Sequence, residues 1–202
     1  MSNKENNKIK NICIFASSSD NIDKIHFKAA YEMGAKIGDN GFNIIYGGSV
    51  LGLMGEATNA ARAHGAEITG VMPEKLYNLG IFEGECTKFI LTKGMRERKA
   101  KMDELSDAII ALSGGFGTLE ELSEMIVQKQ LGYNNKPIVI LNTDGFYDNL
   151  IKFFNDIISR RFAPEITNKL YYVTNSPDEA INYIKTYNFE EINYLNKKLS
   201  IK

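Results

Sequence analysis

The chain has 202 residues, 44% of them hydrophobic and 24% charged, with a formal net charge of −1. This balance predicts one globular domain and argues against broad electrostatic attraction to nucleic acid or an anionic membrane. The chain has two cysteines and two histidines, which are too few for a disulfide framework or a histidine-based metal site. It has no long apolar run and no signal-peptide core, so we expect a cytoplasmic protein.

Apolar runs and apolar residues at helical spacing alternate along the chain. From the N-terminus we expect strands at 8–15, 42–46 and 66–72, with helices at 22–39 and 51–64 between them. An irregular segment at 75–84, a strand at 87–91, a helix at 95–106 and a strand at 107–112 follow. The remainder contains a helix opened by Thr118, a strand at 137–141, a helix at 145–161, a strand at 170–173 and a helix at 177–187. Both histidines are expected on helix surfaces. Residues 1–187 are read as a single domain and residues 188–202 as a polar tail.

Several of these strands are continuous apolar runs, which is typical of strands that are buried on both faces. The pattern therefore predicts an α/β protein with a Rossmann-like, doubly wound parallel sheet and helices on both faces. Ligands of such sheets bind beyond the carboxyl ends of the strands. Three polar or glycine-rich loops, at 16–20, 47–49 and 113–117, are expected at that edge.

The loop at 113–117 is the most informative stretch, because it brings Gly114, Gly115 and Gly117 to the start of a helix. Glycine lets a ligand approach bare backbone, and the N–H groups at a helix N-terminus suit a phosphate. The spacing matches neither the dinucleotide fingerprint GxGxxG nor the nucleoside triphosphate loop GxxxxGK[ST]. A phosphate seat beside an acid suggests an enzyme that acts on a phosphorylated small molecule.

Thr118 and Glu121 also admit a purely structural interpretation, because Thr-x-x-Glu is a capping box. On a helical wheel Glu120 points into solvent, whereas Glu121 falls at the edge of the apolar stripe. Of the two acids, Glu121 is better placed to enter a cleft.

Arg98 lies on the same helical face as Met95, Met102 and Leu105. An arginine on a buried stripe costs several kcal/mol unless it finds an anion. An internal ion pair, a snorkelling side chain, and a contact with a substrate or a catalytic acid all remain open. Lys99 flanks the same stripe.

These segments resemble the motifs of one family. The residues Met95, Arg98 and Lys99, followed by Gly114, Gly115, Gly117, Thr118 and Glu121, resemble the Met-x-x-Arg-Lys and PGGxGTxxE motifs of the LOG (Lonely Guy) family. The family comprises cytokinin riboside 5′-monophosphate phosphoribohydrolases, often mislabelled lysine decarboxylases. Residues 46–48 and 52–55 resemble its YGGGxxGLMG stretch, the serines after the first strand resemble its GSS loop, and the similarity runs from about residue 12 to residue 173.

The resemblance implies hydrolysis of the N-glycosidic bond of an N6-modified adenosine 5′-monophosphate, giving the free base and ribose 5-phosphate. It implies a homodimer or higher oligomer with its site near the subunit interface, and no metal, nicotinamide or pyridoxal phosphate. Arg98 and Glu121 are the implied catalytic residues, with Arg98 keeping the acid ionised. The implied substrate-binding residues are Ser18, Ser19, Gly47, Gly48, Met95, Lys99, Gly114, Gly115, Gly117 and Thr118.

The sequence departs from the family pattern at three serines. Ser113 stands in place of the motif proline, and Ser17 and Ser49 stand where glycine is usual. The segment 76–85 aligns poorly, so the substrate-facing glutamate expected there is Glu83 or Glu85. Two alternative functions remain: a nucleosidase for AMP or another ordinary nucleotide, and a non-enzymatic carrier of a phosphorylated cofactor such as the molybdenum cofactor.

Overall fold

The computed structural model describes residues 9–80 and 85–188. In this part of the chain, parallel strands form one sheet in the order β4-β3-β2-β1-β5-β6-β7. The strands are β1 (Asn11–Phe15), β2 (Asn43–Tyr46), β3 (Ile68–Pro73), β4 (Lys88–Thr92), β5 (Ala108–Ala111), β6 (Ile138–Leu141) and β7 (Tyr172–Thr174). The predicted doubly wound α/β fold is confirmed.

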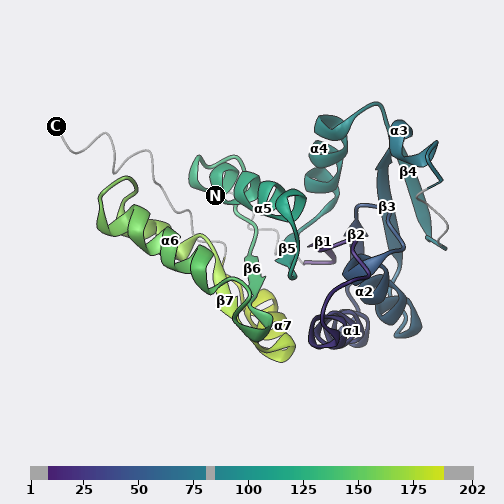
Figure 1. Cartoon of the computed structure of the whole chain (residues 1–202), viewed down its shortest axis with the longest axis horizontal. Coiled ribbons are helices and arrows are strands. Elements are labelled where there is room, and N and C mark those ends of the chain that lie inside the picture. Colours follow the sequence, from purple (N-terminus) through teal and green to yellow (C-terminus); the bar gives the residue numbers. More distant parts are fainter. Residues whose placement is uncertain (1–8, 81–84, 189–202) are drawn as a thin grey trace, which may run out of the picture.

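Helices cover both faces of this sheet (Figure 1). They are α1 (Lys24–Asp39), α2 (Gly52–Ala63), α3 (Glu74–Tyr77), α4 (Met95–Leu105), α5 (Phe116–Gln130), α6 (Asp148–Ser159) and α7 (Pro177–Lys185), with 3-10 turns η1 (Thr143–Gly145) and η2 (Glu165–Lys169). Because successive side chains of a strand point to opposite faces of the sheet, β1 contributes side chains to two hydrophobic cores. Ile12 and Ile14 pack in the core beneath α1, α2 and α7, whereas Cys13 and Phe15 pack in the core beneath α4, α5 and α6.

The order of the strands reverses between β1 and β5, because the chain winds outward to β4 and then returns to the other side of β1. A crevice for a ligand forms at the carboxyl ends of two such strands. Here the loops after β1 and β5 are joined by a hydrogen bond of 3.0 Å from the Ser17 N–H to the Ser113 carbonyl. The fold therefore places two of the three predicted loops at its topological switch point.

Three predicted elements differ from the observed ones. The helix predicted from Thr118 begins at Phe116, the helix predicted at 145–161 is a 3-10 turn followed by α6, and the segment 75–80 carries part of α3. Residues 81–84 and the tail from 189 onward lie outside the described residues. Within the described ranges, no helix is both long and apolar enough to cross a membrane.

Candidate active site

Arg98 and Glu121 meet between α4 and α5, above the carboxyl end of the sheet. The Arg98 Nη1 lies 2.5 Å from the Glu121 Oε1, and the Arg98 Nε donates to the Val71 carbonyl at 3.2 Å. Both residues are buried, with 7% and 8% of their surfaces exposed. Gly47 lies against the guanidinium, since a Cβ at that position would stand 2.1 Å from the Arg98 Nη2. A side chain at position 47 would therefore displace Arg98.

Burial sets the protonation behaviour of this pair. Loss of hydration raises the pKa of Glu121 above its ordinary value, and the Arg98 guanidinium opposes the rise. We expected Arg98 to hold the carboxyl ionised; its charge acts in that direction, but burial is the larger effect. The site therefore contains a carboxyl whose affinity for a proton is increased, in contact with a fixed cation.

Lys99 makes a second set of ion pairs beside the first. Its Nζ contacts Glu120 and lies 2.6 Å from the Glu124 Oε2, and its side chain is 15% exposed. The Glu120 side chain is 55% exposed, so the predicted difference between Glu120 and Glu121 is confirmed. Lys99 thus stands next to the Arg98–Glu121 pair, neutralised by carboxylates of α5.

The glycine-rich turn leads directly into α5, with Gly115 as N-cap and no side-chain capping bond. Thr118 is the third residue of the helix, and a Cβ on Gly114 would stand 2.1 Å from its Oγ1. The capping-box interpretation is therefore wrong: with Gly115 as N-cap, Glu121 lies three residues beyond the position that a capping glutamate occupies, and it pairs with Arg98 instead.

The start of α5 is open to a ligand. Its first N–H groups have no intrahelical acceptor, and a Cβ at Gly115 or Gly117 would meet nothing within 4 Å. Phe116 between them is 92% exposed. An anion can therefore approach the backbone here.

A pocket of about 530 Å³ adjoins this turn, a volume within the range of small-molecule sites. It is lined by Ser17, Asn21, Ile22, Asp23, His26, Ser113, Gly114, Gly115 and Phe146. Ser18 and Ser19, the serines predicted to bind substrate, are exposed in the loop beside it, and Ser17 lines it instead. His26 and Phe146 were not predicted, because they come from elements outside every motif.

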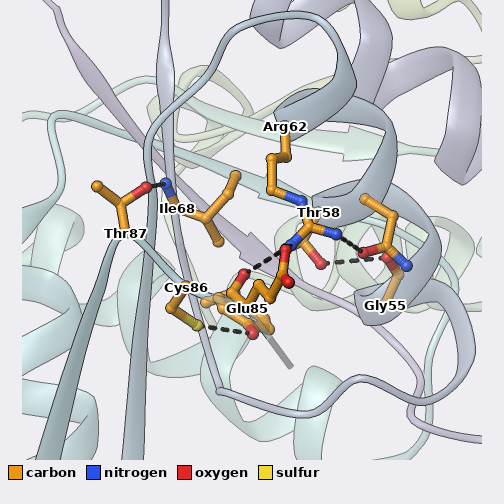
Figure 2. Close-up of polar contacts among 9 residues, drawn as sticks. Gly55, Thr58, Arg62, Ile68, Glu85, Cys86 and Thr87 are labelled. Atoms are coloured by element: carbon orange, nitrogen blue, oxygen red, sulfur yellow. Dashed lines mark hydrogen bonds and ion pairs between the residues drawn. The ribbon is translucent and has the colours of Figure 1, made fainter. Parts of the chain in front are cut away.

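The other predicted residues take separate positions. Gly48 has a φ of 82°, which favours glycine, and packs on Met72. Met95 opens α4 and is 48% exposed. Glu85 pairs with Arg62 of α2 (Figure 2), with 2.8 Å between its Oε2 and the Arg62 Nη1. Glu83 lies outside the described residues.

Two features bear on metal or cofactor chemistry. Among the described residues, no group of three or more His, Cys, Asp or Glu side chains could hold a metal ion. Lys129 is buried, and burial lowers the pKa of its amine to about 8. It lies eleven residues along α5 from Thr118, a distance of roughly 16 Å at 1.5 Å per residue. Its amine is therefore remote from the glycine-rich turn at the start of α5.

Known proteins resemble this chain in sequence and in fold. The family model described as possible lysine decarboxylase matches residues 54–184. The chain is 34% identical over 180 residues to the cytokinin riboside 5′-monophosphate phosphoribohydrolase LOG of Oryza sativa subsp. japonica, covering 89% of this chain and 74% of the relative. It is 33% identical over 187 residues to LOG7 of Arabidopsis thaliana, covering 92% and 86%. The molybdenum cofactor binding protein of Rippkaea orientalis shares the fold, with a TM-score of 0.68 and 23% identity over 89% of this chain and 97% of that one.

Proposed function

Because this chain belongs to the LOG family, we propose that it hydrolyses the N-glycosidic bond of a nucleoside 5′-monophosphate. The products are the free base and ribose 5-phosphate. The substrate we propose is an N6-modified adenosine 5′-monophosphate, on the strength of the activity named for its relatives in rice and Arabidopsis.

The 5′-phosphate occupies the start of α5. The backbone N–H groups between Gly115 and Thr118 face it, and the positive end of the helix dipole favours its charge. The Thr118 hydroxyl and the loop of Ser17, Ser18 and Ser19 supply the other hydrogen-bond donors of this phosphate-binding site. The openness of the backbone at Gly115 and Gly117 supports this placement.

Glu121 acts on the ribose. As the bond from C1′ to the base nitrogen lengthens, its electrons pass to the base and the sugar gains oxocarbenium character. The Glu121 carboxylate stabilises that positive charge and orients the water that adds to C1′; this water loses one proton as it adds, and the departing base nitrogen gains one. Arg98 fixes the carboxylate in place through the 2.5 Å contact.

The observation that carries the proposal is the buried Arg98–Glu121 pair, whose acid lies in the second turn of the helix that has the open N-terminus. A carrier needs only the phosphate seat, whereas an acid held in a dry position within reach of the ligand is what bond cleavage requires. The pair therefore favours the hydrolase over the carrier.

Chromatographic detection of free base from a panel of nucleotides tests the proposal. We expect release of N6-isopentenyladenine from its 5′-monophosphate, and faster turnover than with AMP. Preference for AMP would instead support the broader nucleosidase, and tight binding without any release of base would support a carrier. Light scattering of the purified protein tests the accompanying proposal of a homodimer or higher oligomer.

A further inference from the structure

Ser113 stands where the family motif has proline, and the structure gives it a partner of its own. Its side chain is buried, with 4% of the residue exposed. Its Oγ shares a hydrogen bond of 2.9 Å with the Nδ1 of His26 on α1, which is 87 residues away in the sequence. A contact of this kind links α1 to the first residue of the glycine turn.

This contact matters because serine and proline constrain a turn by different means. Proline fixes its own φ and restricts the residue before it. Serine does neither, and its hydroxyl is costly to bury unless it is hydrogen-bonded. The bond to His26 satisfies the hydroxyl and ties the start of the turn to a rigid helix.

His26 is itself held by a chain of aromatic contacts. Its ring meets Phe146 edge-on, with 5.7 Å between centroids, and Phe146 meets Tyr147 in the same way at 4.9 Å. The Tyr147 hydroxyl donates to the Leu112 carbonyl at 2.7 Å. The contacts thus run from Ser113 through three rings and return to the residue that precedes it.

We propose that His26 is a positioning residue for the ligand's phosphate group. Its hydrogen bond to Ser113 and its ring contact with Phe146 fix the conformation of the turn from Ser113 to Gly115. This conformation in turn sets the direction of the backbone N–H groups at the start of α5, which face the phosphate. It replaces the constraint that a proline would supply. The inference rests on the proposed function, because it concerns the same phosphate seat.

A double-mutant cycle tests this proposal, with binding of ribose 5-phosphate measured by calorimetry and KM and kcat measured with the best nucleotide. We expect His26→Ala to weaken ribose 5-phosphate binding about tenfold and to raise KM more than it lowers kcat. In a Ser113→Pro background the same His26→Ala change should alter binding less than twofold. Proline is the residue of the family motif at this position, and the substitution removes no backbone hydrogen bond of Ser113 seen among the described residues.

Ser113→Ala provides a second background if the proline variant does not fold. It removes the hydroxyl, so His26→Ala should then have little further effect on binding. His64→Ala is the matched control, since His64 bonds Asp39 at 2.7 Å instead; it should leave binding unchanged. The proposal would be overturned if His26→Ala weakened ribose 5-phosphate binding by the same factor in every background. It would also be overturned if His26→Ala lowered the melting temperature and left binding unchanged.

The two proposals fail in distinguishable ways. Wild-type protein that binds ribose 5-phosphate and AMP but cleaves no nucleotide contradicts the hydrolase, and the dissociation constants of the cycle still decide the role of His26. Wild-type protein that binds no phosphorylated ligand overturns both.

Discussion

The Arg98 guanidinium lies 2.5 Å from the Glu121 carboxylate, and both side chains are almost completely buried. Replacing such a pair by apolar residues is often neutral or stabilising, so the pair is poor evidence for a role in stability. Glu121 belongs to the same helix whose first turn is open, five residues after its first residue, Phe116. We therefore interpret the pair as part of the reaction chemistry, and the first predictions separate that role from a structural one.

Glu121→Gln should lower kcat/KM by at least about 100-fold, because it removes the charge that faces the developing cation while keeping the shape of the side chain. Glu120→Gln is the matched control one residue away: its side chain is exposed and forms an ion pair with Lys99, so turnover should stay close to that of the wild type. Hydrolysis at a near wild-type rate by the Glu121 variant would refute a catalytic role.

Arg98→Ala should abolish turnover and also lower the free energy of unfolding, by roughly 3–5 kcal/mol, because it leaves a buried carboxylate without its cation. Arg96→Ala, on the exposed side of the same helix, should change neither quantity. Steady-state kinetics and urea unfolding measure the two effects. Retained activity with reduced stability would mean that the ion pair is structural only.

The pH dependence of kcat/KM should report the raised pKa of Glu121 in the ligand-free protein. The ionised carboxylate is the active form, so activity falls as the pH drops through this pKa. Because burial raises it, the acid limb should lie at higher pH than the ordinary glutamate value of about 4.3. Glu120 also raises this pKa, so Glu120→Gln should move the limb to lower pH. A limb at or below the ordinary value would contradict the effect of burial.

The sequence predicts the sheet well because buried parallel strands are continuous apolar runs, as at 138–141. It misplaces the start of α5 because Gly-Phe-Gly looks like loop, whereas the first helical turn needs no apolar residue and no capping side chain. Arg98 and Glu121 are predictable from helical spacing and motif. His26 is not, because its contact with Ser113 depends on how α1 and β5 meet in space.

The glycines of the turn should respond differently to alanine. At Gly114 the new Cβ would stand 2.1 Å from the Thr118 Oγ1, so both stability and ligand binding should fall, the former by about 1–3 kcal/mol. At Gly115 the space is open and φ is −85°, so the cost to stability should be only about 0.5 kcal/mol.

The Gly115→Ala methyl group would nevertheless lie where we place the phosphate. We therefore expect clearly weaker binding of ribose 5-phosphate by calorimetry, with a melting temperature close to that of the wild type. Unchanged binding in this variant would show that the anion sits elsewhere.

Lys129 provides a prediction about stability rather than activity. Its amine makes no hydrogen bond within the described part of the chain, although it lies 4.8 Å from the centre of the Tyr187 ring. Burial lowers its pKa from the ordinary 10.5 to about 8. Between these two pH values the unfolded chain binds more protons than the folded one, so the stability due to this residue rises with pH.

Lys129→Met keeps the volume and removes the charge. At pH 7 the variant should therefore be more stable than the wild type, by about 2 kcal/mol once the ring contact is allowed for. The difference should shrink towards zero near pH 10, where the folded wild type carries a neutral amine. Urea unfolding at both pH values measures it, with Lys28→Met, an exposed lysine, as the control. A difference that does not change with pH would mean that the amine is hydrated in the folded protein.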